Sequence, residues 1–236
     1  MLDIYTRMKL PHAARVDQVM AKKLFYEQPH FSSHEQKLFT RDIEKITLRA
    51  QLLPENTHLL SFVDEVREYR GMLYLEIALR QQAHRQRIAE LCWQFLPWPQ
   101  VLIFRYDTMY ALNMALVRLN QADKSRNTVE ERLDTDWGEA DDALWQAVSL
   151  QDVPAQDFYQ LYRGLFDRLS QFMAAQKLNL QDADGAAARA ALAREAELDR
   201  RIAELRAQMK KTTQFNRQAE LNMQIRALNQ ERQRKS

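Results

Sequence analysis

Apolar positions follow a helical period early in the chain. Between residues 32 and 54 the apolar side chains recur every three or four residues, which lines one face of a helix. The run consists of Phe39, Ile43, Ile46, Ala50 and Leu53. Ser32 and Glu35 precede it with the spacing of a capping box, and Pro54 follows it. We therefore predict a helix that begins after Ser32 and ends before Pro54, preceded by a shorter helix between residues 16 and 24.

After residue 58 the period changes to two, which is typical of strands. A first predicted hairpin joins residues 59–67 to residues 72–80. A second joins residues 100–106 to residues 109–118, and an amphipathic helix over residues 88–95 lies between the two hairpins. The fold class that follows is α+β, with a four-stranded, mainly antiparallel sheet flanked by helices.

A narrow apolar stripe runs through the C-terminal segment. It has heptad spacing at first and resumes in another register after a polar break at residues 210–213. The stripe consists of Leu198, Ile202, Leu205, Met209, Leu221, Ile225 and Leu228. A helix with so thin a stripe is marginal alone, so we expect a helical hairpin, or a coiled coil with a second copy or another protein. Phe215 then joins either the closure of the hairpin or the contact with the partner.

Charge is distributed unevenly along the chain. Residues 128–186 carry 4 Lys/Arg and 12 Asp/Glu, whereas the segment after them carries 12 Lys/Arg and 6 Asp/Glu. We expect an α+β core at residues 1–119, an acidic arm with a helix packing on that core at residues 120–186, and basic coiled-coil-like helices at residues 187–236. The basic end can attract the acidic arm, meet a phosphate or an acidic partner, or be a solvated surface.

Composition excludes several protein classes. The 236 residues are 46% hydrophobic and 28% charged, with four Gly and six Pro, which excludes collagenous, low-complexity and disordered chains. The single cysteine, Cys92, excludes an intrachain disulfide. There is no apolar run of about 18 residues, and charges interrupt the first thirty positions. We expect a cytoplasmic protein that does not contact a membrane.

Carboxylates near the first predicted hairpin are weak candidates for catalysis. Asp64, Glu65 and Glu76 could hold Mg²⁺, as in restriction nucleases that carry a Glu-x-Lys pair on a strand. Here Ala78 occupies the lysine position, and Arg80 supplies a cation that titrates too high to act as a base. The other interpretation is that Glu76 and Arg80 form a surface ion pair.

Other catalytic motifs are missing from the sequence. The five histidines are His12, His30, His34, His58 and His84. Only His30 and His34 are four residues apart, and they straddle a helix start, so we predict no metal site. The four scattered glycines build no phosphate loop. We expect no cofactor.

Basic residues in the tail are candidates for nucleic-acid binding. They include Lys210, Lys211, Arg217 and Arg226. Such side chains could neutralise phosphates, and the binding would weaken steeply with salt. The alternative is a solvated helix face, because Glu, Gln and Asn are interleaved with them.

Several short segments, in order along nearly the whole chain, resemble a known family. They are Lys23–Glu27, Leu38–Ile46, Leu53–Glu55, Leu75–Arg80, Leu96–Pro99, Thr135–Trp137, Leu161–Tyr162 and Gln214–Asn222. This succession is similar to an uncharacterised bacterial family catalogued as domain of unknown function 4391. The resemblance implies that the gene for this protein lies beside genes for DNA methyltransferases and helicases, in islands of anti-phage defence genes. Arg80 departs from the lysine that members often carry there.

Three functional hypotheses follow. The first is a non-enzymatic accessory subunit of a restriction-like defence system, which docks on a helicase or methyltransferase, or on another copy, through its C-terminal helices. The second is a divergent metal-dependent nuclease that uses Asp64, Glu65 and Glu76. The third is a DNA-binding subunit that uses the basic tail.

Overall fold

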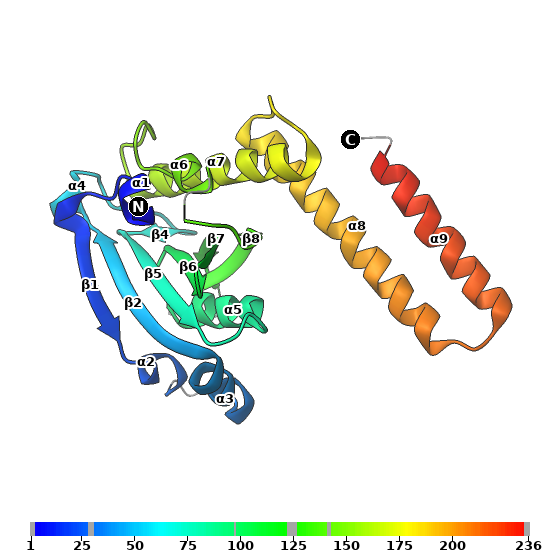
Figure 1. Ribbon diagram of the computed structural model, residues 1–236. Coiled ribbons are helices and arrows are strands. Elements are labelled where there is room, and N and C mark those ends of the chain that lie inside the picture. Colours follow the sequence, from blue (N-terminus) through cyan, green and yellow to red (C-terminus); the bar gives the residue numbers. More distant parts are fainter. Residues whose placement is uncertain (1–2, 28–30, 97, 122–126, 141–142, 234–236) are drawn as a thin grey trace. The chain divides into compact units, whose positions relative to one another are not determined.

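The structure is a computed structural model that describes residues 3–27, 31–96, 98–121, 127–140 and 143–233 (Figure 1). Contacts divide the chain into two compact units, residues 1–169 and residues 170–236. The first unit holds the sheet and the short helices. The second holds the C-terminal helices.

A mixed sheet forms the centre of the first unit. Within the described residues, six strands follow one another in the order β1-β2-β5-β6-β7-β8. Their bounds are β1 (Arg15–Met20), β2 (Ile43–Leu52), β5 (Met72–Leu79), β6 (Gln100–Tyr106), β7 (Met109–Leu119) and β8 (Asn127–Asp134). β5 and β6 run parallel because α5 (Arg85–Phe95) crosses over between them, and the other neighbours are antiparallel. The prediction of a four-stranded, mainly antiparallel sheet is therefore wrong.

The predicted helix up to Pro54 is wrong in its second half, where the chain forms a strand. The helix α3 (Ser33–Asp42) begins with the predicted capping box of Ser32 and Glu35, but it ends at Asp42 and the chain continues as β2. β2 pairs with β5 with register shifts between Ile43 and Lys45 and between Leu48 and Ala50. Each bulge adds a residue to β2, so its buried apolar positions Ile43, Ile46 and Ala50 are spaced by three and four residues instead of two.

The strand partners also differ from the prediction. Residues 59–67 do not pair with residues 72–80. They contain β3 (Phe62–Val63), which pairs instead with β4 (Glu68–Tyr69) in a separate two-stranded sheet. The segment predicted as a short helix over residues 16–24 contains the edge strand β1. β8, at the other edge, comes from the segment predicted to be a non-periodic acidic arm. The second hairpin, β6 with β7, is confirmed.

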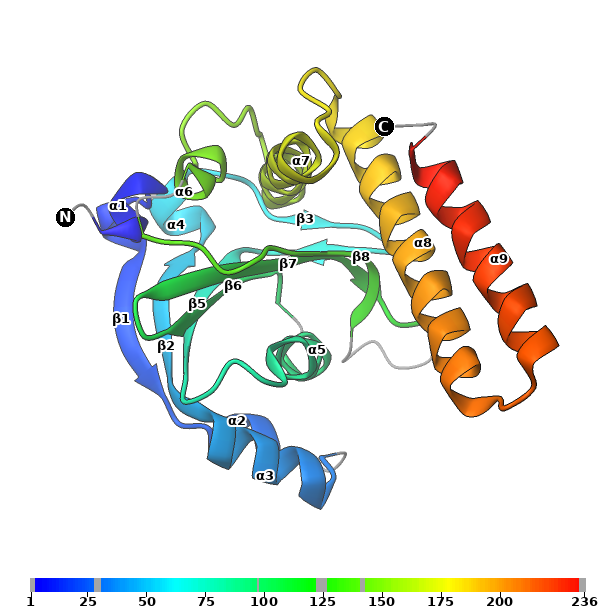
Figure 2. The ribbon, with the colours of Figure 1, turned by 45° about the vertical axis from the view of Figure 1, so that its right-hand side comes forward.

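Helices cover both faces of the sheet (Figure 2). α5 lies on one face, where the indole Nε1 of Trp93 donates to Oδ1 of the buried Asn113 at 2.7 Å. The first part of α7 (Phe158–Leu178) lies on the other face, where the hydroxyl of Tyr162 donates to the Gln100 carbonyl at 2.7 Å. The remaining helical turns of this unit are α1 (Ile4–Arg7), η1 (His12–Ala14), α2 (Lys23–Tyr26), α4 (Pro54–Thr57) and α6 (Leu144–Ala147).

The second unit contains a helical hairpin of α8 (Gly185–Lys211) and α9 (Phe215–Gln233). Asp184 caps α8 by accepting a hydrogen bond from the Ala187 N–H at 2.8 Å. The two helices enclose a small apolar core of Leu198, Ile202, Ile225 and Leu228, with Leu205 packed against it. No helix in the described part of the chain is both long and apolar enough to cross a lipid bilayer.

Candidate functional site

Glu76 lies in the middle of β5 and is 5% exposed. Its carboxylate accepts hydrogen bonds from the hydroxyl of Tyr5, from Nη2 of Arg49 at 2.9 Å and from Nε of Arg105 at 3.3 Å. Arg49 and Arg105 come from β2 and β6, the two strands that flank β5. The buried negative charge is therefore paired from both sides.

Two of the partners of Glu76, Tyr5 and Arg49, keep their protons. Burial, followed by the negative charge of Glu76, raises the pKa of Tyr5, so its hydroxyl remains a donor. Burial alone would lower the pKa of Arg49, but Asp17, Tyr5 and Glu76 together raise it. A metal ion could reach the Glu76 carboxylate only by displacing these donors.

The other two candidate carboxylates lie elsewhere, in the turn between β3 and β4. Oδ1 of Asp64 accepts hydrogen bonds from the backbone N–H groups of Val66 at 2.7 Å and Arg67 at 2.5 Å, and Glu65 is exposed. The partners of Asp64 and of Glu76 do not overlap. Within the residues that the structure describes, no group of three or more His, Cys, Asp and Glu could hold a metal ion.

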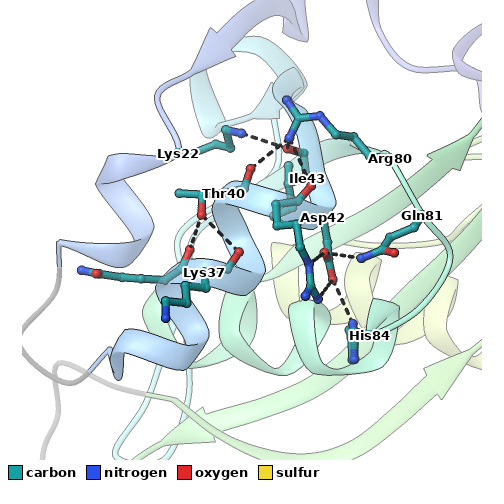
Figure 3. Close-up of polar contacts among 10 residues, drawn as sticks. Lys22, Lys37, Thr40, Asp42, Ile43, Arg80, Gln81 and His84 are labelled. Carbon is teal, nitrogen blue, oxygen red and sulfur yellow. Dashed lines mark hydrogen bonds and ion pairs between the residues drawn. The ribbon is translucent and has the colours of Figure 1, made fainter.

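Arg80 binds backbone rather than Glu76. Its Nη1 donates to the carbonyls of Thr40 at 2.9 Å and Ile43 at 2.7 Å, where Nζ of Lys22 also donates at 2.8 Å (Figure 3). These carbonyls lie at the C-terminal end of α3, where cations are favourable. Two of the segments that carry the family resemblance, Leu38–Ile46 and Leu75–Arg80, thus meet at this corner.

Asp42, at the same corner, is fully buried and orients a histidine (Figure 3). Its carboxylate accepts hydrogen bonds from Nε of Arg41 at 2.5 Å, from Gln81 and from Nδ1 of His84 at 2.9 Å. Burial alone would raise the pKa of Asp42, but the hydrogen bonds from Arg41, His84 and Gln81 outweigh it and lower that pKa. An ionised carboxylate only accepts, so Nδ1 of His84 carries the proton in this contact.

His84 is the most exposed member of this cluster apart from Arg41, with 48% of its side chain accessible. Its backbone φ of 65° places it in the left-handed region before α5. Among the described residues, no side chain forms a hydrogen bond or ion pair with its second ring nitrogen. Asp42 therefore orients the solvent-facing ring of His84, and the contact ties the end of α3 to the start of α5.

Sequence reasoning missed the residues that surround Glu76 and Asp42. Tyr5, Arg49 and Arg105 belong to elements far apart in the sequence, so no local spacing indicates them. The one usable signal is the alternation of Lys45, Thr47 and Arg49, which has the strand period inside a segment predicted to be a helix. His30, one of the five histidines, lies outside the described residues.

The predicted partner-binding stripe closes the hairpin on itself. Leu198, Ile202, Leu221, Ile225 and Leu228 are buried, Leu205 and Met209 are partly buried, and Phe215 is 81% exposed. Of the candidate DNA-binding residues, Arg217 pairs with Glu220 at 2.8 Å. Lys210, Lys211 and Arg226 are exposed, and within the described chain none of them pairs with a carboxylate.

A groove of about 320 Å³ lies in the second unit beside this hairpin. Its apolar lining comes from the end of α7, the loop after it and α8, and consists of Leu178, Leu180, Ala190, Ala191 and Leu198. Charged residues from both hairpin helices also line it and pair with one another: Arg194 with Glu231 at 2.5 Å, and Arg232 with Glu195 at 2.7 Å. The charged side chains that line the groove thus neutralise one another, and the rest of the lining is apolar.

Comparisons with known proteins yield a family and no individual relative. Neither the curated proteins nor the solved structures contain a match to this chain. A family model described as Domain of unknown function (DUF4391) matches residues 8–231, which confirms the resemblance found in the sequence. The chain therefore belongs to this family.

Proposed function

We propose that this protein is a non-enzymatic accessory subunit of a bacterial restriction-like anti-phage defence system. It docks on a helicase-like or methyltransferase partner through its C-terminal unit. The observation that carries the proposal is the groove beside the hairpin. Apolar side chains line this groove, although the apolar side chains between α8 and α9 are already buried against each other. The gene context implied by the family resemblance supports the choice of partner.

The groove suits an apolar segment of a protein partner. Docked side chains would bury apolar surface, and about 25 cal/mol is gained for each Å² removed from water. The paired charges of Arg194 with Glu231 and of Arg232 with Glu195 form a polar border that costs little to approach. Of the stripe residues, Leu198 lines the groove directly, whereas Ile202, Ile225 and Leu228 act indirectly by holding together the two helices that shape it.

The test is a titration of the purified partner, encoded beside this gene, with the full chain. Ala190 lines the groove and is exposed, so Ala190→Trp fills the groove without disturbing the hairpin core. Ala207→Trp, at an exposed position of the same helix outside the groove, is the matched control. We expect Ala190→Trp to abolish binding and Ala207→Trp to retain it. Equal binding by both variants would refute groove docking.

Self-association is an alternative use of the same helices. A second copy could place its own apolar residues in the groove and thereby compete with the partner. Light scattering of the full chain distinguishes the two cases, since a dimer that Ala190→Trp converts to a monomer would identify the second copy as the occupant.

DNA binding by the tail is a second candidate function. It is favoured by Lys210, Lys211 and Arg226, which meet no acidic partner in the described chain. Retention on duplex DNA should then fall steeply between low and moderate salt. Retention that does not change with salt would count against it.

A metal-dependent nuclease is the remaining alternative. The pairing of β2 with β5 favours a nuclease in one respect. Lys45 on β2 lies directly opposite Ala78 on β5, so a lysine stands beside the position where β5 lacks the lysine of the Glu-x-Lys pair. It would require Glu76 to release Arg49 or Arg105. Incubation with unmodified phage DNA and Mg²⁺ or Mn²⁺ tests it, and cutting that persists after Glu76→Ala would exclude these carboxylates.

A further inference from the structure

Several cations converge on one face of the sheet in the first unit. Ala78 on β5 pairs with Lys45 on β2 and with Arg105 on β6, and paired residues point to the same face. Arg80 follows the end of β5, and its guanidinium lies at the C-terminal end of α3 beside this face. Arg49 reaches Glu76 on the face itself. We call the set of Lys45, Arg49, Arg80 and Arg105 the basic sheet face.

Acidic groups do not balance this face. Glu76 is buried and already shared by Arg49 and Arg105, and Asp17 accepts from Arg49 at 2.9 Å. Lys45 and Arg80 are exposed, and within the described residues neither pairs with a carboxylate. Glu76 and Asp17 thus meet two of the four cations, and Asp3 lines the pocket beside Arg49 and Asp17. In the described part of the chain, the charges of Lys45 and Arg80 are left without a paired carboxylate.

Lys22 adds a further cation at the edge of this face. Its Nζ and Nη1 of Arg80 donate to the same Ile43 carbonyl, at 2.8 Å and 2.7 Å (Figure 3). Burial, followed by the charge of Arg80, lowers the pKa of Lys22. Two like charges held this close repel each other, so an anion that contacts both would be stabilised.

The spacing of the cations favours a chain of phosphates over a single anion. Residues advance by about 3.3 Å along a strand, so Lys45 and Arg49 are about 13 Å apart on β2. A single phosphate cannot contact two side chains whose backbone positions are this far apart, whereas successive phosphates along a nucleic-acid backbone can. Arginine and lysine are also the side chains that most often contact phosphodiester oxygens.

We propose that the basic sheet face binds the phosphodiester backbone of a nucleic acid. The site lies on β2, β5 and β6 and involves neither the C-terminal groove nor the basic tail. It therefore adds a second binding surface to the proposed partner-binding function and does not depend on it. Because the contacts are to phosphate, the binding should depend weakly on base sequence and strongly on salt.

The experiment measures fluorescence anisotropy of a labelled DNA duplex with the full chain, between about 50 and 200 mM salt. Lys45→Glu reverses an exposed charge that has no partner to lose. It should weaken binding about tenfold and lower the slope of log affinity against log salt by about one. Lys45→Arg keeps the charge and should bind like the wild type.

The matched control reverses two charges in the tail, Lys210→Glu with Lys211→Glu. If the basic sheet face holds the backbone, this double variant keeps the affinity and the salt slope. Loss of binding in the tail variant with none in Lys45→Glu would overturn the proposal in favour of the tail. Absence of binding at the lowest salt, or equal binding of polyglutamate, would overturn it as well.

Discussion

The two units of the chain differ in whether they bury paired carboxylates. In the first unit, Glu76 and Asp42 are buried carboxylates, each held by three side chains. In the second unit the ion pairs lie at the surface of a hairpin whose apolar core has four buried members. A buried pair cannot lose a partner cheaply, whereas a surface pair contributes about 1 kcal/mol or less. We therefore expect the first unit to resist rearrangement around these carboxylates and the second to exchange its surface pairs more easily when it meets a partner.

The largest expected effect is in the hairpin core. Ile202→Asp places a carboxylate among Leu198, Ile225 and Leu228, and we expect a loss of at least about 3 kcal/mol in the stability of the second unit. Hydrogen exchange should show that α8 and α9 lose protection while β5 and β6 keep theirs. The control is Ala203→Asp, at an exposed position of α8. Loss of protection in both units would show that they unfold together and would break the contrast.

Asp42 should make the first unit sensitive to acid. Because its pKa is lowered by folding, its contribution is complete above the unfolded value of about 3.9 and is lost as the pH falls through the folded value. Asp42→Asn should cost about 1–3 kcal/mol at neutral pH and nothing at pH values below both pKa values. Denaturant unfolding at several pH values measures this. A difference that persists unchanged in acid would contradict the assignment.

Tyr5 tests the pairing of Glu76. Tyr5→Phe removes one donor and leaves Arg49 and Arg105, so we expect a loss of about 1–2 kcal/mol in unfolding free energy. Tyr106→Phe is the control, because its ring packs against Trp137 and the substitution keeps that ring. If the two variants are equally stable, the Tyr5 hydroxyl contributes nothing.

The smallest effects come from the helix caps, one in each unit. Ser32 accepts from the Glu35 N–H at 3.3 Å, and Asp184 accepts from the Ala187 N–H at 2.8 Å. Each alanine variant should cost about 1 kcal/mol. We expect Ser32→Ala to lower the protection of α3 alone and Asp184→Ala that of α8 alone, as followed by hydrogen exchange. A cap variant that affects the other unit would argue for coupling between them.

Local signals predicted some elements and misled on others. The capping box at Ser32 and the hairpin of β6 and β7 depend on residues close in sequence, and both are confirmed. The bulges of β2 gave the apolar residues of a strand the spacing expected of a helix. The crossover through α5 placed β6 parallel to β5 and beside it. Neither follows from local periodicity. The domain boundaries at residues 119 and 186 stay predictions.

The candidate sites were harder to predict than the elements. Glu76 and Arg80 were singled out from sequence, but their partners come from strands and helices distant in the chain. The apolar stripe from Leu198 to Leu228 was visible, because heptad spacing is local. The turn at residues 212–214 brings α8 and α9 together, so that the stripe residues face each other. Periodicity alone does not predict this turn.

Hydrogen exchange of the full chain, alone and with its helicase or methyltransferase partner, tests the central claim most directly. We predict that the partner increases protection in α8 around Ala190 and at the end of α9 around Arg232, the residues that line the groove. Protection in β5 and β6 should stay the same. An increase confined to β2, β5 and β6, with none in the C-terminal unit, would contradict docking through the groove.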